Sequence, residues 1–202
     1  GANGVAFADF NGDGRGDILT GSESGGAVRL YNQLSSGGFA SPATLSVTAA
    51  VRVLRTGPLF DDPASTVDDA IDDLVVVNGS SGQVTAVCNG STGAAATSAV
   101  LPTVVMGARD AVVVRVNASA HAVAYISPLQ GNLYLAETIG PFAPRCTSLA
   151  FDPNTLAIGA VSATAITGGR LLTRGTAVED IVVITTTGDA FLLANAPAQA
   201  GG

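Results

Sequence analysis

Acidic and amide side chains occupy alternate positions of one short segment near the N-terminus. Asp9, Asn11, Asp13 and Asp17 stand at positions 1, 3, 5 and 9 of a nine-residue stretch that also holds three glycines. Glycines relieve the backbone strain of a tight turn, and the carbonyl of Arg15 at position 7 can supply a further oxygen. Hard oxygen ligands that include three carboxylates are the set that Ca²⁺ prefers. The spacing therefore predicts a calcium site, with Ca²⁺ as the cofactor, in this loop.

The loop differs from the calcium loop of a helix–loop–helix site. It lacks the glutamate at position 12 of such a site, and Ile18 and Leu19 begin a predicted strand instead. The alternative interpretation is a solvated Asp/Gly turn without metal. The position of the tripeptide Arg15-Gly16-Asp17 is explained by the spacing of the predicted calcium ligands. Because Asp17 is expected to turn inward to its own metal, we do not predict an adhesion motif here.

A second acidic segment, "LFDDPASTVDDAIDD", precedes another predicted strand. Asp61, Asp69 and Asp73 fit positions 3, 5 and 9 of the same pattern, but Leu59 replaces the first aspartate. A solvated acidic loop is the favoured interpretation. Its crowded carboxylates would repel one another without a cation, so a weak second metal loop stays open.

The elements around these loops repeat along the chain. Four units each read as a buried strand, a Gly/Ser turn and a second strand, with a further β-rich segment upstream. The turn glycines fall in register at Gly26, Gly82, Gly131 and Gly188, spaced 56, 49 and 57 residues apart. Units of about fifty residues with four strands each are typical of propeller blades. The sequence predicts an all-β fold, a β-propeller of four-stranded antiparallel blades.

The whole chain, 1–202, is predicted to be a single propeller region. A blade cannot bury both of its faces alone, so four blades either close on themselves or form part of a larger propeller. We expect the larger propeller. The predicted blades span about 4–48, 51–101, 108–150 and 157–195.

The first unit, "VAFADFNGDGRGDILTGSESGGAVRLYNQ" followed by "GGFASPATL", resembles the FG-GAP/VCBS repeat, the blade of integrin-α-like propellers. That family places D-x-[DN]-x-D-G-x-x-D between the first two strands of a blade and binds calcium there. The resemblance implies the same role for Asp9, Asn11, Asp13 and Asp17. It covers residues 4–48 closely, whereas the other three units share the strand pattern only.

Composition excludes several classes of function. The net charge is −7, and residues 1–73 carry ten acidic side chains against four arginines. Such a chain is not expected to bind nucleic acid or an anionic membrane surface. Membrane insertion is not expected either, because no apolar run approaches the eighteen or so residues that a membrane span requires. His121 is the single histidine, and its sequence context suggests no nucleophile–base pair. We therefore expect no enzymatic activity.

Two kinds of covalent feature are predicted. The sequons at Asn78, Asn89 and Asn117 indicate a secreted glycoprotein if the source is eukaryotic. Cys88 and Cys146 are compatible with an inter-blade disulfide or with two buried free thiols, and both alternatives stay open.

Together these features favour a non-catalytic, extracellular, Ca²⁺-stabilised scaffold at the cell surface or in an adhesion or matrix assembly. Its expected partners are proteins of that assembly or other domains of the same chain. The alternative is a glycan-binding, lectin-like module or the accessory propeller of a polysaccharide-active enzyme. Lectins need aromatic platforms in each blade, and aromatic residues make up only 5% of this chain.

Overall fold

A computed structural model defines the fold. It describes residues 3–24, 27–45, 47, 50–60, 71–89, 95–101, 107–117, 120–128, 131–139, 150–157, 162–171 and 178–194.

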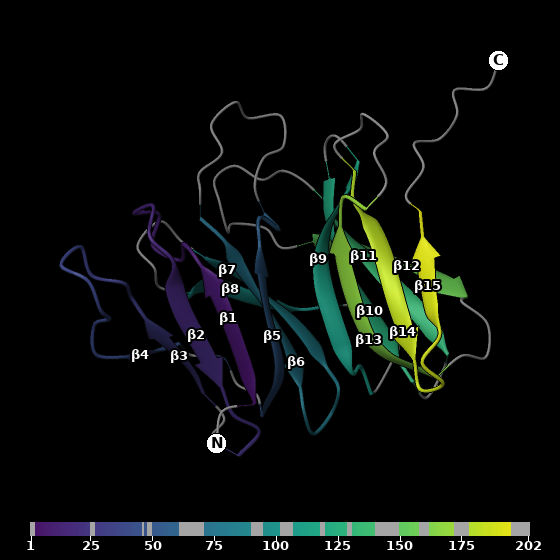
Figure 1. Cartoon of the computed structure of the whole chain (residues 1–202), viewed down its shortest axis with the longest axis horizontal. Helices are drawn as coiled ribbons and strands as arrows, with labels where there is room; N and C mark the ends of the chain where they lie inside the picture. The colour runs from purple at the N-terminus through teal and green to yellow at the C-terminus, as the bar shows by residue number, and fades with distance from the viewer. Residues whose placement is uncertain are drawn as a thin grey trace.

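The described residues form four antiparallel sheets in which strands adjacent in sequence pair with one another (Figure 1). The first sheet contains β1 (Gly4–Ala8), β2 (Asp17–Gly21), β3 (Val28–Tyr31) and β4 (Ala43–Leu45). The second contains β5 (Val51–Gly57), β6 (Asp73–Asn78), β7 (Val84–Asn89) and β8 (Ala95–Val100). The third contains β9 (Asp110–Asn117), β10 (Ala120–Ser127), β11 (Asn132–Ile139) and β12 (Ala150–Ala157). The fourth contains β13 (Ala163–Gly169), β14 (Asp180–Thr185) and β15 (Ala190–Leu193).

This architecture confirms the predicted all-β class and the succession of blade-like sheets. Within the described ranges every element is a strand, and no helix long and apolar enough to cross a membrane is found. We refer to the four sheets as blades one to four.

The first strand of each blade lies on the inner side of the arrangement. β1 contacts β5, β5 contacts β9, and β9 contacts β13. β1 and β5 run side by side in the same direction, since Gly4 faces Val51 and Leu54 near their starts while the Thr56 hydroxyl donates to the Phe7 carbonyl near their ends. The inner strands of neighbouring blades therefore pack against one another, and the remaining strands of each blade lie further out.

Three apolar clusters fill the spaces between consecutive blades. Leu19 and Leu30 of blade one pack with Leu54 and Val76 of blade two in the first. Corresponding clusters lie between blades two and three and between blades three and four. Burial of Val, Leu and Ile side chains between sheets is the main stabilising contribution to such a fold.

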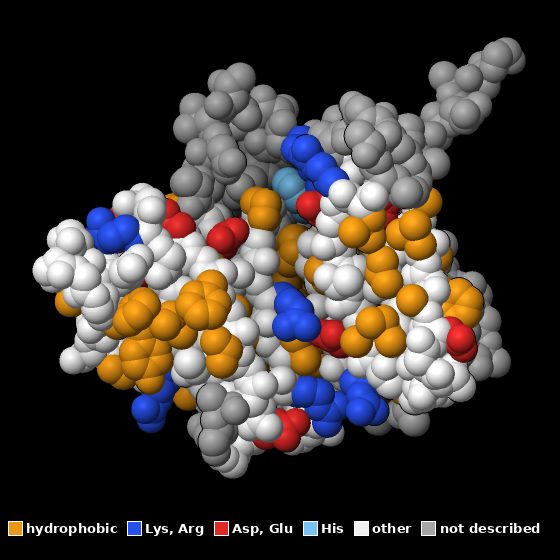
Figure 2. Space-filling view, viewed as in Figure 1, with side chains coloured by type: hydrophobic (Ala, Val, Ile, Leu, Met, Phe, Trp, Pro, Cys, Tyr) orange, Lys and Arg blue, Asp and Glu red, His pale blue; other side chains and the backbone are white. Residues whose placement is uncertain are grey.

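The outward faces of the first and last blades differ from these interfaces. Val5 and Phe7 of β1 are 53% and 68% exposed, and Ile184 and Leu192 of blade four are 41% and 47% exposed. Figure 2 shows hydrophobic side chains gathered on both sides of the molecule. Equivalent faces elsewhere in the chain are covered by a neighbouring blade, so a larger propeller stays our prediction.

Register shifts mark β-bulges in three inner strands, β5, β9 and β13. The register of β5 against β6 shifts between Val51 and Val53, and that of β13 against β14 shifts between Ala163 and Ala165. A bulge inserts one residue and breaks the alternation of side chains. Consequently Val51 and the residue three positions later, Leu54, are both buried against blade one.

One blade boundary lies later than the sequence pattern indicates. The outer strand of blade three extends to Ala157, beyond the predicted limit of 150, and pairs Pro153 with Ala136. Asp152-Pro153-Asn154 is a turn signal by composition. Proline is tolerated on an edge strand, because its missing N–H leaves no ladder bond unmade on the open side.

The turn glycines behave as predicted where the structure describes them. Gly82, Gly131 and Gly188 adopt φ values of 69°, 63° and 85° in the turns that follow the second strands. Gly82 has an additional constraint, because a Cβ there would lie 2.3 Å from the Cα of Gly107. Gly26 lies outside the described residues.

Candidate functional site

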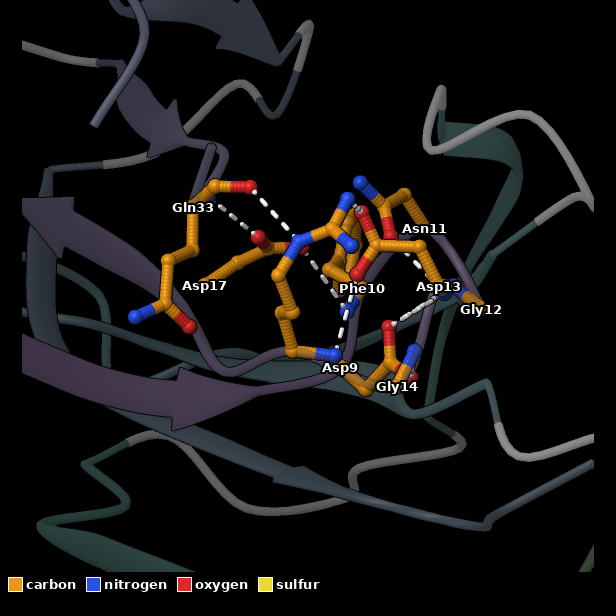
Figure 3. Close-up of polar contacts among 9 residues, drawn as sticks. Asp9, Phe10, Asn11, Gly12, Asp13, Gly14, Asp17 and Gln33 are labelled. Atoms are coloured by element: carbon orange, nitrogen blue, oxygen red, sulfur yellow. Dashed lines mark hydrogen bonds and ion pairs between the residues drawn. The ribbon is translucent and has the colours of Figure 1, made fainter. Parts of the chain in front are cut away.

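The loop of residues 9–17 joins the end of β1 to the start of β2, where Ala8 pairs with Asp17. Gly12 and Gly14 adopt φ values of 73° and 78°. This left-handed conformation is open to glycine at little cost and lets the chain reverse within a few residues. The predicted ligands Asp9 and Asp17 thus flank a tight turn (Figure 3).

Asp9 organises the turn through its carboxylate. Oδ1 accepts from the backbone N–H groups of Gly12 at 2.8 Å and Asp13 at 3.1 Å, and Oδ2 accepts from that of Gly14 at 2.6 Å. Hydrogen bonds of this kind satisfy backbone donors that no strand pairs. The first predicted ligand therefore holds the loop curled around its own side chain.

Asn11 and Asp13 continue the same pattern. Oδ1 of Asn11 accepts from the N–H of Asp13 at 3.0 Å, and Oδ1 of Asp13 accepts from the N–H of Arg15 at 2.9 Å. The guanidinium of Arg15 forms an ion pair with the Asp13 carboxylate and donates through Nε to the Gln33 carbonyl at 3.1 Å. The arginine side chain therefore links the loop to the end of β3.

Asp17 is fully buried. Its Oδ2 accepts from the N–H of Phe10 at 3.1 Å, and its Oδ1 accepts from the N–H of Gln33 at 2.8 Å. Burial raises the pKa of Asp17 above its ordinary value; these two hydrogen bonds oppose the shift, and repulsion from Asp13 and Asp9 adds to it. The carboxylate is thus desolvated among like charges, an arrangement that a bound cation would stabilise.

The donor chemistry of this loop fits Ca²⁺, but its side chains do not meet at one point as they stand. Figure 3 shows Asp17 beside Gln33, away from Asn11 and Asp13. Among the residues that the structure describes, no three His, Cys, Asp or Glu side chains are close enough to hold a metal ion together. To receive a cation, the Asp13 carboxylate has to leave its ion pair with Arg15. Asp9, Asn11, Asp13, the Arg15 carbonyl and Asp17 stay the predicted ligands.

Asp73 of the second acidic segment is also fully buried. Its Oδ2 accepts from the N–H of Phe60 at 2.8 Å, and its Oδ1 accepts from the N–H of Asn89 at 2.9 Å. Asp61 and Asp69 lie outside the described residues. In this part of the chain Asp73 therefore has a structural role, and the weak second metal loop stays a prediction.

The three sequon asparagines have different environments. Asn78 is half-buried and Asn117 is exposed. Asn89 is fully buried, and its amide donates to the carbonyls of Phe10 and Asp72. A glycan on Asn89 would have to break these bonds, so the burial argues for Asn78 and Asn117 as the acceptors.

Cys88 is buried in β7 and disulfide-bonded. Cys146 lies outside the described residues, so the pairing of these two cysteines stays a prediction. His121 is buried on β10, at 8% exposure.

The sequence pattern missed one polar group. Asp110, at the start of β9, accepts from Nη2 of Arg55 in blade two at 2.7 Å and from the N–H of Ile166 in blade four at 3.2 Å. One carboxylate thus connects three blades. The residues lie more than fifty positions apart in sequence, so no motif spacing signals their proximity.

Four successive antiparallel sheets, joined along their inner strands, define a protein of the β-propeller class. The family model of the FG-GAP repeat matches residues 1–33, which include the whole acidic loop, β1, β2 and β3. The resemblance of the first unit to that repeat is confirmed, and FG-GAP repeats form propellers. No curated protein matches the chain.

Proposed function

We propose that this chain is a non-catalytic, Ca²⁺-stabilised propeller scaffold that binds other proteins in an extracellular or cell-surface assembly. The FG-GAP match at residues 1–33 supports a scaffold for protein interaction. FG-GAP domains are in general non-catalytic scaffolds. The calcium dependence, the extracellular location and the protein partner are our own inferences.

The arrangement around Asp17 is the observation that carries the calcium part of this proposal. A fully buried carboxylate that accepts only backbone N–H bonds and is repelled by the charges of Asp13 and Asp9 is electrostatically unfavourable in the absence of a cation. When bound, Ca²⁺ supplies the positive charge that these carboxylates lack. Asp9, Asn11 and Asp13 would hold it on the turn, with the Arg15 carbonyl and Asp17 completing the set.

Calcium at this position would fasten β1 to the end of β3, because Asp17 already bonds to Phe10 on one side and Gln33 on the other. A cation that binds only the folded chain stabilises it by mass action, by about 2.7 kcal/mol at a hundredfold excess over its dissociation constant. Bound calcium would then make blade one more rigid, and the loops that differ from blade to blade would contact the partner.

The glycan-binding alternative has weaker support. Tyr125 and Tyr134 stack with ring centroids 5.3 Å apart, but both rings are buried between blades two and three. These aromatic side chains serve packing and present no flat surface to a sugar.

Two measurements test the proposal. Thermal unfolding of the chain in Ca²⁺ and in excess chelator should differ by several degrees, with Mg²⁺ as the control for a general ionic effect. Affinity capture from the native source should recover a partner protein in calcium and lose it in chelator. Hydrolysis of a polysaccharide or an ester by the purified chain would refute the non-catalytic role.

A further inference from the structure

A second polar site lies where the inner strands of three blades begin. A cavity of about 430 Å³ is lined there by Arg52, Val53, Arg55, Arg109, Asp110 and Thr164. β1 and β5 run in the same direction, and the loop 9–17 follows the end of β1. The cavity is therefore at the opposite end of the inner strands from the candidate calcium loop.

The charge of this cavity contrasts with that of the molecule. The chain has nine basic side chains, all arginines, and a net charge of −7. Three of these arginines line the cavity, and among its described lining residues Asp110 is the single acidic one. Figure 2 shows blue side chains in the middle of the view and directly below it, near the lower edge of the molecule, with red side chains beside them.

The three arginines differ in how far they are neutralised. Arg55 donates to Asp110 at 2.7 Å, so this pair is internally balanced. Arg52 forms an ion pair with Glu23 at 3.3 Å, in which both side chains are partly exposed to solvent. It also donates to the carbonyl of Gly79 at 2.7 Å. Arg109 is exposed and forms no ion pair with any described residue. The cavity keeps an excess of positive charge.

The backbone is shaped at the same place. The register of β5 shifts at Arg52 and that of β13 shifts at Thr164, and both of these residues line the cavity. A bulge re-aims the side chain of the inserted residue and is frequent beside binding sites. Bulges in two different blades thus direct side chains to one cavity.

We propose that this cavity is a binding site for an oxyanion group, a carboxylate, sulfate or phosphate. A guanidinium is a planar donor group that binds the oxygens of such anions in pairs, and Arg109 and Arg52 both line the cavity. Asp110 holds Arg55 in place through hydrogen bonds from Ala111 and Ile166. The anion reaches the site as a free ion or as the acidic side chain of a peptide.

The proposal is independent of the calcium loop and of the scaffold role. Binding is carried by Arg52 on β5 and by Arg109 directly before β9, so a chain that fails to bind Ca²⁺ should still bind the anion. A negatively charged molecule repels anions in general, and binding therefore has to come from this local cluster.

Calorimetric titration of the chain with inorganic sulfate and with a hexaglutamate peptide tests the site at low ionic strength. We expect saturable binding that weakens as sodium chloride is added. Arg109→Gln should weaken it about tenfold, the loss expected for one charge-assisted hydrogen bond. Asp110→Asn should tighten binding several-fold, because it removes the negative charge and frees Arg55 for the ligand.

Arg29→Gln is the matched control. Arg29 is exposed on β3, outside the cavity, so this variant removes the same charge without touching the site. Tighter binding of hexaglutamate than of sulfate identifies an acidic peptide as the ligand, and binding of sulfate alone identifies a free anion. The proposal is overturned if neither probe binds, or if Arg29→Gln weakens binding as much as Arg109→Gln. Circular dichroism establishes that each variant is folded. If Asp110→Asn does not fold, the comparison of Arg109→Gln with Arg29→Gln still tests the proposal.

Discussion

Asp17 of blade one and Asp73 of blade two accept equivalent pairs of hydrogen bonds. Each carboxylate accepts from the N–H of a phenylalanine in the preceding loop, Phe10 or Phe60, and from the N–H sixteen residues further on, Gln33 or Asn89. Both carboxylates are fully buried. The two loops differ in length and composition, so the shared element is the bridging aspartate at the start of the second strand.

The first prediction concerns this bridge. Asp73→Ala leaves two buried N–H groups without their acceptor and should lower the free energy of unfolding by roughly 2–4 kcal/mol. Asp73→Asn keeps one accepting oxygen and should lose less. Urea denaturation followed by fluorescence or circular dichroism measures both. An alanine variant as stable as the parent would show that the bridge contributes nothing.

The second prediction separates the calcium role of Asp13 from its ion pair. Asp13→Ala should lower the melting temperature in calcium and change it little in excess chelator, because an exposed ion pair with Arg15 contributes only about 0–1 kcal/mol. Asp152→Ala, at an exposed position of β12, is the control. Equal losses with and without calcium would mean that Asp13 acts without a metal.

The third prediction uses two glycines of similar backbone conformation. Gly82 and Gly38 have φ values of 69° and 74°. A Cβ at Gly82 would lie 2.3 Å from the Cα of Gly107, whereas a Cβ at Gly38 would meet no atom within 4 Å. Gly38→Ala should cost about 1 kcal/mol of strain, and Gly82→Ala should cost more because the backbone of Gly107 must also move. Equal melting temperatures for the two variants would refute the close approach.

The fourth prediction follows from a buried tyrosine. Burial, with repulsion from Tyr134 as the smaller cause, raises the pKa of Tyr125 to about 12. Between about pH 10, where an unfolded tyrosine ionises, and pH 12, the folded chain binds more protons than the unfolded chain. The contribution of Tyr125 to stability is therefore intact below pH 10 and falls as the pH rises through this window.

Absorbance of tyrosinate during an alkaline titration measures this shift. The folded chain should show a late ionisation that Tyr125→Phe removes. Ionisation of Tyr125 near pH 10 while circular dichroism still reports native sheet would contradict the prediction.

The fifth prediction concerns the sequons and applies to expression in a eukaryotic secretory route. Asn78 and Asn117 should carry glycans, and Asn89 should not, because it is fully buried. Peptide mapping by mass spectrometry before and after glycosidase treatment identifies the acceptor sites. Asn78→Gln and Asn117→Gln together should abolish the mass loss, and a glycan found on Asn89 would show that its burial is wrong.

Much of the fold was predictable because its signals are local. Short apolar segments bounded by turn residues define strands such as β2 and β6, and glycines at Gly82, Gly131 and Gly188 mark the turns that need a left-handed backbone. The donor set of the loop 9–17 is also local, since its members lie within nine residues and a tight turn must bring them near one another.

Tertiary structure decided what depends on distant neighbours. The burial of Asn89, the bridge from Asp110 to Arg55 and Ile166, and the arginine cavity all join residues of different blades. The bulges at Arg52 and Thr164 carry no glycine or proline that would mark them, and Pro153 lies within a strand although its sequence context is typical of a turn. Sequence spacing sets which side chains a turn or strand presents, whereas packing between blades sets which of them meet.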